Sequence, residues 1–251
     1  PLFVTLNLLP AGLSRETPPD WEFSGRTIDA FVNRMLRAGF FPTLFASPEA
    51  ARAHAPMLEE FSDRGCEVGL LVAPNQSPLL NEKKPFGALS PTDQSRILQR
   101  ARELFYEYMG YTPRVVRTGL YSGDASIFAR CAAAGFSHSS IRLPGAQLAT
   151  IHTVWPIEHA IETNHTIDIP VSTNPDERLF NRYPVYLSPD FGSAAQITQL
   201  THQAATRGHL CLASSTVTDY YDYKATVHDN IDAFILATDE IAGLQPMRIT
   251  Q

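Results

Sequence analysis

The chain contains 251 residues, of which 26 are acidic and 20 are basic, giving a net charge of −6 at pH 7. It has no basic stripe interleaved with aromatic residues, and because such a stripe is absent, nucleic acid is not the expected partner. No apolar run is long enough to span a bilayer, and the opening PLFVTLNLLPAG lacks the basic region of a signal peptide. We therefore expect a cytoplasmic protein without a membrane span, folded as one domain over residues 1–251.

A repeated αβ unit runs through the sequence. Five amphipathic runs break at a glycine and are followed by an apolar, β-rich run, at Gly39, Gly65, Gly110, Gly135 and Gly208. Glycine adopts the left-handed conformation just past a helix end without a Cβ clash, so each marks a helix leading into a strand. The repetition predicts a parallel sheet or barrel wrapped in helices, with ligands bound at the carboxyl ends of the strands.

The predicted elements alternate along most of the chain. Strands are expected over residues 2–9, 42–45, 67–72, 115–116, from 136 onward, 167–171 and 210–213. Helices are expected between Ser24 and Gly39, from Ser47-Pro48 to Arg64, from Ser90-Pro91 to Gly110, from Asp124 to Ala134, and over 195–207 and 227–241. Residues 10–24 read as a long loop, and 143–189, rich in Pro, Asn and His, contains one expected strand.

The three cysteines do not suggest a disulfide or a zinc site. Cys66, Cys131 and Cys211 are widely spaced, and each lies inside an apolar or helical segment. We interpret them as core thiols, which suits a reducing compartment.

The block from Leu89 to Ile141 carries a distinctive order of features. A capped helix is followed by a Gly-x-x-Pro turn, a strand ending in arginine, a second helix and a Gly-aromatic step into a Ser-Ser strand. The segments VTLNLLP, FFPTLFAS, RGCEVGLLVAPN and IDIPVS stand in matching order around it. In this order the chain resembles the NodB-like polysaccharide deacetylases, carbohydrate esterase family 4. The resemblance implies an α/β fold, an incomplete (β/α) barrel, and in active relatives a divalent metal such as zinc that serves hydrolysis of a sugar N-acetyl or O-acetyl group.

The family's first metal motif is altered in this chain. Two adjacent aspartates, a general base and a metal ligand, end the first strand in the family, and their positions match Asn7 and Leu8. Asparagine has no carboxylate to take a proton from water, and leucine has no lone pair to offer a cation.

The imidazole positions are altered too. The family's paired metal histidines match Leu71 and Asn75, or Ala73 under the spacing of a related subfamily, and its late histidine matches Ser214 or Ser215. Because metal affinity depends on several donors acting together, we expect no bound metal cofactor.

Part of the family's pocket persists. Arg117 stands where the family uses an arginine to orient the catalytic carboxylate, and Tyr121 follows on the next loop. Without that aspartate, the arginine is expected to bind a substrate carboxylate or phosphate through its planar fork. The alternative is that Arg117 pairs with Asp124 or Asp168 and only braces the barrel.

Other polar residues provide candidate catalytic groups. His138 falls near the family's Asp-Ser-Ser position and is a candidate general base, oriented by Asp124 or Asp219; the alternative is a hydrogen-bonded core histidine. His152, His159 and His165 cluster in sequence near Glu158 and Asp168, but their spacing matches no common zinc signature, so solvated loop histidines are favoured.

The candidate substrate-binding set joins these polar positions to aromatic faces. Its members are Asn7, Trp21, Asn75, Arg117, Tyr121, Ser214 and Ser215. Trp155, Tyr220, Tyr221 and Tyr223 provide further stacking faces, although aromatic residues at this density equally suit rim packing.

Three functions follow as hypotheses. The first is a barrel that has lost metal-dependent deacetylation and recognises an N-acylated sugar, free or lipid-linked, in surface-polysaccharide (O-antigen or lipopolysaccharide) metabolism. The second is an active carbohydrate amide or ester hydrolase with a rebuilt site. The third is an interaction scaffold, which predicts a pocket filled by side chains.

Overall fold

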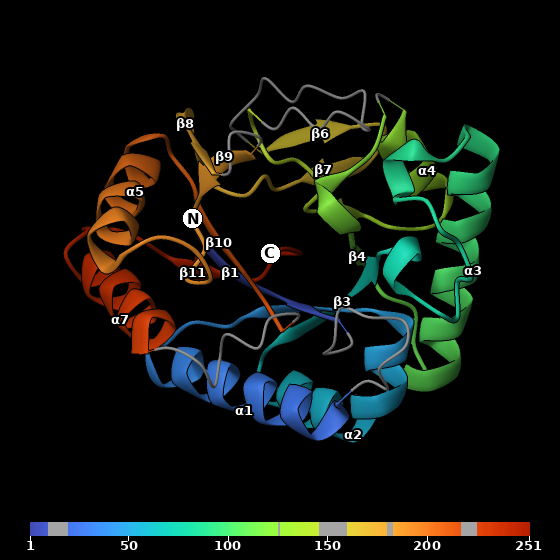
Figure 1. The fold of residues 1–251 in the computed structure, drawn as a ribbon, viewed down its shortest axis with the longest axis horizontal. Coiled ribbons are helices and arrows are strands. Elements are labelled where there is room, and N and C mark those ends of the chain that lie inside the picture. Colours follow the sequence, from blue (N-terminus) through green and yellow to red (C-terminus); the bar gives the residue numbers. More distant parts are fainter. Residues whose placement is uncertain (10–19, 125, 146–159, 180–182, 217–224) are drawn as a thin grey trace.

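A curled, mainly parallel sheet forms the centre of the molecule (Figure 1). The computed structural model describes residues 1–9, 20–124, 126–145, 160–179, 183–216 and 225–251. Within them the strand order is β10-β1-β2-β3-β4-β5-β7-β6, with β11 also pairing with β1 and a separate hairpin β8-β9. The strands are β1 (Leu2–Leu8), β2 (Thr43–Ala46), β3 (Glu67–Val72), β4 (Val115–Thr118), β5 (His138–Ser139), β6 (Ile161–Thr163), β7 (Thr166–Asp168), β8 (Thr173–Leu179), β9 (Tyr183–Tyr186), β10 (Leu210–Ser215) and β11 (Pro246–Met247).

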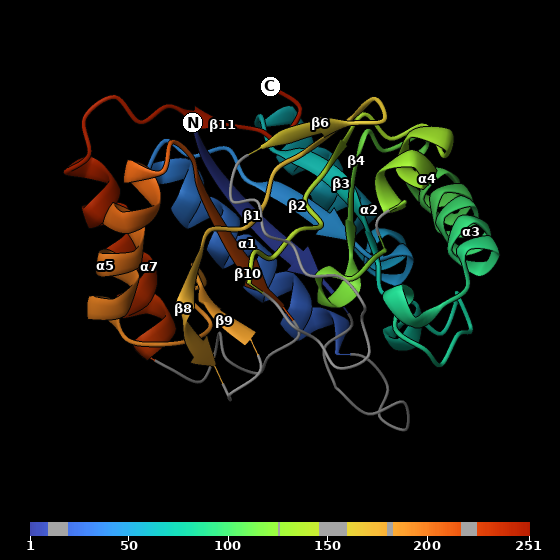
Figure 2. The ribbon, with the colours of Figure 1, turned by 90° about the horizontal axis from the view of Figure 1, so that it is seen from above.

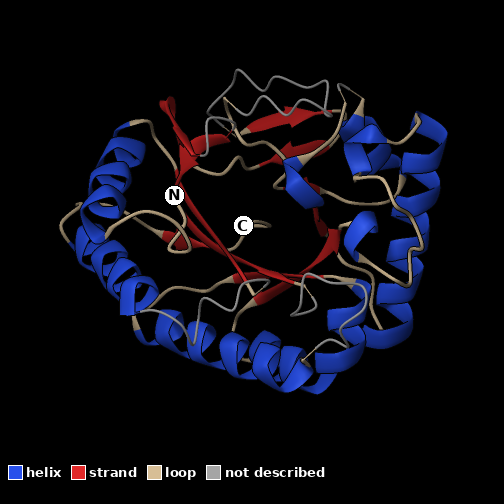
Figure 3. Ribbon diagram, viewed as in Figure 1, coloured by secondary structure: helices blue, strands red, loops and turns tan. Residues whose placement is uncertain are grey.

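Helices surround this sheet on three sides (Figure 3). They are α1 (Trp21–Arg37), α2 (Pro48–Asp63), α3 (Pro91–Met109), α4 (Ile127–Ala133), α5 (Ala194–Thr206) and α7 (Ala225–Asp239), with 3-10 turns η1 (Pro74–Gln76), η2 (Phe86–Ala88) and η3 (Gly119–Tyr121). Seen from above, α5 and α7 lie together at one end, and α3 and α4 lie at the other (Figure 2). Among the described residues, no helix is both long and apolar enough to cross a membrane.

The local signals in the sequence correspond to the observed helix ends. The Ser47 and Ser90 side chains accept hydrogen bonds from the backbone N–H groups of Ala50 and Asp93, with proline at the first helical position in both cases. All five glycines that punctuate the αβ repeat have positive φ, between +74° and +96°. These helix starts and ends are therefore confirmed.

Two apolar layers lie on opposite faces of the sheet because side chains alternate along each strand. Along β1, Leu6 and Leu8 pack outward against the helices, whereas Phe3 joins a smaller cluster inside the barrel. Asn7 shares the inward face, and it pairs in register with Phe45 on one side and Ser215 on the other. The apolar residues of the inner cluster therefore fill the interior of the barrel below the carboxyl ends of the strands.

In the described part of the chain, individual hydrogen bonds rather than a strand ladder close the barrel. Between β10 and the opposite side, the Ser172 N–H donates to the Cys211 carbonyl at 3.1 Å, and the Ala213 N–H donates to the Leu187 carbonyl at 2.9 Å. No continuous ladder joins β10 to β7 in the described part of the chain. This is the incomplete (β/α) barrel that the sequence predicted.

Several boundaries differ from the prediction. Helix α1 begins at Trp21, inside the predicted loop, because the Asp20 carboxylate accepts from the Phe23 N–H at 2.8 Å and caps it. Helix α4 begins at Ile127, so Asp124 precedes the helix, although its carboxylate accepts from the Ser126 N–H at 2.8 Å. Strands β6, β8, β9 and β11 were not predicted. All three cysteines are free and buried, as expected.

Candidate functional site

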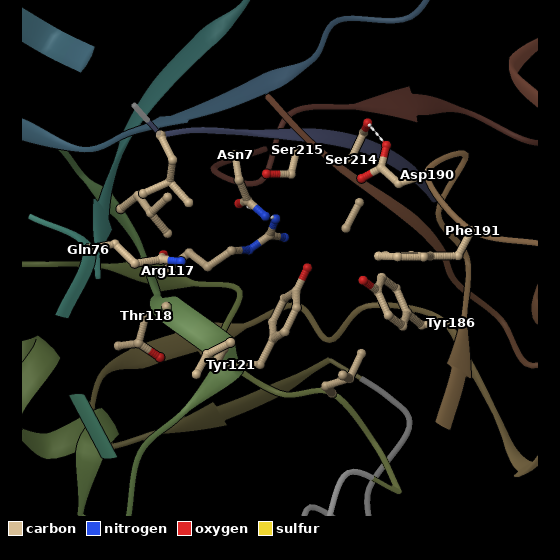
Figure 4. A pocket seen from close by; sticks show the side chains of 16 residues that line it. Asn7, Gln76, Arg117, Thr118, Tyr121, Tyr186, Asp190, Phe191, Ser214 and Ser215 are labelled. Atoms are coloured by element: carbon tan, nitrogen blue, oxygen red, sulfur yellow. Dashed lines mark hydrogen bonds between the residues drawn. The ribbon is translucent and has the colours of Figure 1, made fainter. Parts of the chain in front are cut away.

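A cavity of about 280 Å³ opens at the carboxyl ends of β1, β3, β4 and β10. Five residues of the candidate binding set line it, namely Asn7, Arg117, Tyr121, Ser214 and Ser215. Tyr186, Asp190 and Phe191 complete the opposite wall (Figure 4). The residues that sequence reasoning placed at separate strand ends are thus brought together at one site.

Arg117 forms the floor of the cavity and is only 1% exposed. Its Nε and Nη2 atoms donate to the carbonyl and hydroxyl oxygens of Ser140 at 3.0 and 2.6 Å. Its Nη1 donates to Thr5 Oγ1 at 2.9 Å and to Asn7 Oδ1 at 3.0 Å. All of these acceptors are neutral. The side chain is therefore fixed in position while its positive charge is not balanced by them.

The proposed ion pairs that would brace Arg117 are not formed. Asp168 instead accepts from Arg142 Nε at 2.6 Å, and Asp124 pairs with Arg130. Among the described residues, no carboxylate lies within ion-pair distance of Arg117. Since a buried cation is costly without a partner, its environment favours an incoming anion.

Aromatic rings partly compensate this charge. The Arg117 guanidinium carbon lies 4.3 Å from the ring centroid of Phe45 and 5.3 Å from that of Tyr121, which places it over two negative ring faces. Tyr121 contacts Tyr186, whose ring also meets Phe191 edge-on at 5.7 Å. The cavity therefore combines one cation with a largely apolar wall in which Tyr121, Tyr186 and Phe191 provide the aromatic rings.

A strained turn places Tyr121. Leu120 and Tyr121 have φ values of +56° and +51°, which non-glycine residues rarely adopt. The turn is held because the Thr118 hydroxyl donates to the Ser122 carbonyl at 2.5 Å and the Ser122 hydroxyl donates to the Gly119 carbonyl at 2.7 Å. Burial raises the pKa of Tyr121, so its hydroxyl keeps its proton and can donate to a ligand.

Asp190, like Tyr186 and Phe191, is a site residue that the sequence did not reveal. It follows β9, and its Oδ1 accepts from the Ser214 hydroxyl at 2.6 Å. Burial raises the pKa of Asp190 to about 7, against hydrogen bonds from Ser214, the Ser215 backbone and Ser188 that act in the opposite direction. An acidic residue in a loop that follows a strand could have indicated it. The strand before this loop, β9, was not predicted, so that signal was not recognised.

Two members of the candidate binding set do not line the cavity. Trp21 begins α1 and packs edge-on against His54, with ring centroids 5.5 Å apart. Asn75 lies in η1, where its neighbour Gln76, rather than Asn75, reaches the cavity wall.

The structure does not bring His138 and Asp124 to the cavity. His138 begins β5 and pairs with Val115 at the start of β4, whereas the cavity lies at the strand ends. Its Nδ1 lies 2.9 Å from the Ser137 hydroxyl, and burial lowers its pKa. A histidine at the amino ends of the strands cannot reach a ligand bound at their carboxyl ends.

The histidine-rich segment is only partly described. His165 is exposed in the turn between β6 and β7, away from the cavity lining. The other residues proposed for this region or for stacking lie outside the described residues; they are His152, Trp155, Glu158, His159, Asp219, Tyr220, Tyr221 and Tyr223.

The donors in the cavity do not fit the divalent metal that the fold's relatives would use. Asp190 is the one carboxylate in the described lining, which contains no imidazole. No group of three or more His, Cys, Asp or Glu residues that could hold a metal ion occurs among the described residues. Zinc prefers several thiolate, imidazole or carboxylate ligands, a set that this lining does not provide.

Comparison with known proteins supports the fold rather than an activity. No protein-family model matches the sequence, and no curated protein is significantly similar to it. Among solved structures, PuuE allantoinase has a TM-score of 0.67 at 13% identity, covering 99% of this chain and 87% of that one. A probable polysaccharide deacetylase from Pseudomonas aeruginosa has a TM-score of 0.65 at 13% identity, covering 98% and 87%. A putative polysaccharide deacetylase from Mycobacterium smegmatis has a TM-score of 0.63 at 14% identity, covering 99% and 85%.

These likenesses extend over nearly the whole chain, so they include the curled sheet and the helices around it. The chain therefore has the NodB-like fold of polysaccharide deacetylases and family 4 carbohydrate esterases.

Proposed function

We propose that this protein binds an N-acylated sugar in the cavity at the strand ends and that metal-dependent deacetylation has been lost. The observation that carries this proposal is the buried Arg117 guanidinium, which occupies the cavity floor with only neutral hydrogen-bond partners. A fixed cation at that position suits a polar or anionic ligand. The described lining has one carboxylate and no imidazole, a donor set that does not suit a bound metal ion.

The remaining lining suits a carbohydrate. Tyr121, Tyr186 and Phe191 provide apolar faces against which the C–H face of a sugar ring can pack. The amide of Asn7 and the hydroxyls of Tyr121 and Ser215 provide polar groups that match an acyl amide and ring hydroxyls. A cavity of about 280 Å³ accommodates a single sugar residue rather than a polymer segment.

The setting we propose is cytoplasmic surface-polysaccharide metabolism, such as O-antigen or lipopolysaccharide assembly, with a free or lipid-linked sugar as ligand. The three free, buried cysteines suit a reducing compartment. Polysaccharide deacetylases among the structures of similar fold support a sugar as the ligand class.

The proposal is tested by titrating N-acetylglucosamine into the purified protein, with EDTA present, by isothermal calorimetry. We expect saturable binding that weakens at least tenfold in Arg117→Gln and stays unchanged in Arg130→Gln, which alters a part-buried arginine that is paired with Asp124 and does not line the cavity. Binding that needs added zinc or cobalt, or equal affinity in Arg117→Gln, would contradict it.

A second candidate is a hydrolase with a rebuilt site. The observation that favours it is Asp190, whose raised pKa of about 7 suits a general acid or base near neutral pH. The test is acetate release from chitobiose by wild type and Asp190→Asn. Turnover that Asp190→Asn abolishes would establish hydrolysis, whereas binding without acetate release would leave the binding function.

A third candidate, the interaction scaffold, requires side chains to fill the barrel mouth. The open cavity favours a ligand-binding role over this one.

A further inference from the structure

Resting on the proposed function, we propose that the cavity selects N-acylated sugars that also carry a carboxylate, and that Asp190 takes up a proton when such an acid binds near neutral pH. The ligand carboxylate lies against the guanidinium of Arg117. Asp190, on the opposite wall, then contacts the ligand as a neutral carboxyl group.

The charge balance of the cavity favours a ligand that carries a carboxylate. Arg117 is 1% exposed and donates to Ser140, Thr5 and Asn7, none of which carries charge. A guanidinium stays protonated throughout the accessible pH range, so this floor is permanently positive. Nε, Nη1 and Nη2 already donate to these residues, so the charge of the guanidinium rather than a free planar fork attracts a ligand carboxylate, which relieves the cost of the buried charge.

The position of Asp190 allows its ionisation to affect a ligand bound at Arg117. One carboxyl oxygen accepts from the Ser214 hydroxyl at 2.6 Å, while the other points toward the cavity (Figure 4). This fixes the side chain at the rim of the same space that Arg117 underlies. With its pKa raised to about 7 by burial, Asp190 exchanges its proton close to neutral pH.

The groups around Asp190 leave it as the titrating group of the cavity. Its carboxyl group is hydrogen-bonded to the Ser214 hydroxyl and the Ser215 backbone on β10, and to the Ser188 hydroxyl in its own loop. Helix α7 contributes Asn230, a neutral amide that donates to the Pro189 carbonyl at 3.0 Å.

The other titratable or charged groups on the facing elements are Tyr186, Tyr121 and Arg117. Tyr186 lies on β9 and Tyr121 on η3, where burial raises the pKa of Tyr121 further above its ordinary value. Arg117, on β4, keeps its charge. Within the described residues, a change of charge in the cavity near pH 7 therefore comes from Asp190.

Binding of an anion and ionisation of Asp190 then oppose each other. Ionised Asp190 offsets part of the positive potential of Arg117 and repels a ligand carboxylate, whereas neutral Asp190 does neither. By linkage, affinity for an acidic sugar is highest below about pH 7 and falls by up to about tenfold per pH unit above it. A neutral sugar lacks this coupling.

The experiment compares N-acetylmuramic acid with N-acetylglucosamine, because the acid adds a carboxylate to the same N-acetylated ring. Dissociation constants are measured by calorimetry between about pH 5.5 and 8.5, where the ligand carboxylate stays ionised. We expect the acid to bind at least about tenfold more weakly at the alkaline end, with proton uptake shown by buffers of different ionisation enthalpy. The neutral sugar should change by less than about twofold.

Asp190→Asn is expected to remove the pH dependence and to keep the high affinity for the acid. Asp63→Asn, a matched change at an exposed acid at the end of α2, should keep the wild-type profile. This inference would be overturned if both sugars bound with an affinity that does not depend on pH, or if the pH dependence survived in Asp190→Asn. Either result would leave the proposed function standing. Absence of binding by either sugar at any pH would overturn both.

Discussion

Two buried arginines in the same barrel have opposite electrostatic settings. Arg117 and Arg142 are each 1% exposed. Arg142 donates from Nε to Asp168 at 2.6 Å, and that carboxylate also accepts from the Ser139 hydroxyl and the Ile141 N–H. Arg117 has only neutral acceptors and faces the cavity.

The difference separates a structural cation from a recognition cation. The Arg142–Asp168 pair joins β7 to the segment after β5, and a completed pair of this kind has no charge left for a ligand. Arg117 is positioned just as firmly, but its charge remains available to an anion. Burial and rigidity alone therefore do not distinguish the two roles; the identity of the acceptors does.

Breaking the completed pair should give the largest effect. Asp168→Ala leaves Arg142 buried without its counter-ion, and we expect the free energy of unfolding to fall by about 3–5 kcal/mol. Urea denaturation at neutral pH measures this loss. Asp124→Ala removes a partly exposed partner of Arg130 and should cost less than about 1 kcal/mol. Equal losses in the two variants would show that the buried pair has no special structural role.

Removing the recognition cation should affect binding more than folding. Arg117→Gln eliminates charge-assisted contacts worth about 1.5–3 kcal/mol to a ligand, so affinity for N-acetylmuramic acid should fall at least about tenfold. Stability should change less than in Asp168→Ala, because an uncompensated buried charge disappears with the side chain. An unfolding loss as large as that of Asp168→Ala would assign Arg117 to the structural class.

The turn beside Arg117 tests whether the aromatic wall matters. A Cβ at Gly119 would lie 2.8 Å from Ala73 Cβ, so Gly119→Ala should shift the turn that places Tyr121 and cost about 1–3 kcal/mol of stability. Sugar affinity should fall with it. Gly39→Ala has no atom within 4 Å of its new Cβ and strains only a φ of +80°, so it should lower stability without changing affinity.

Much of the fold could be predicted because its signals are local. The capping serines and the helix-ending glycines act within a few residues, and Glu67–Val72 was predicted with its observed bounds. Strands β6 and β11, which were not predicted, have only three and two residues, too few for a periodic pattern to emerge. Their pairing depends on tertiary contacts that no short window of sequence contains.

The site was predicted in part for a related reason. Asn7, Arg117 and the two serines of β10 were singled out because they match positions of the family's motifs, and they lie at the ends of strands that were predicted, with Tyr121 on the loop after Arg117. His138 lies at the beginning of a strand whose bounds and register the sequence did not reveal.

A pH-dependent effect on stability should be the smallest. Since the pKa of Asp190 is raised to about 7, its contribution to stability is full below its ordinary pKa of 3.8 and is lost as the pH rises through about 7. Asp190→Asn should therefore raise the free energy of unfolding by on the order of 1 kcal/mol at pH 8 and by little at pH 4. A variant less stable than wild type at pH 8 would assign the ionised carboxylate a structural role.

The most direct test of the central claim, that Arg117 is a recognition cation, is a crystal structure of the protein soaked with N-acetylmuramic acid. We predict the sugar ring against Tyr186 and Phe191, with its carboxylate within hydrogen-bonding distance of the Arg117 guanidinium. A metal ion held at the cavity, or the sugar bound elsewhere with Arg117 untouched, would contradict the account.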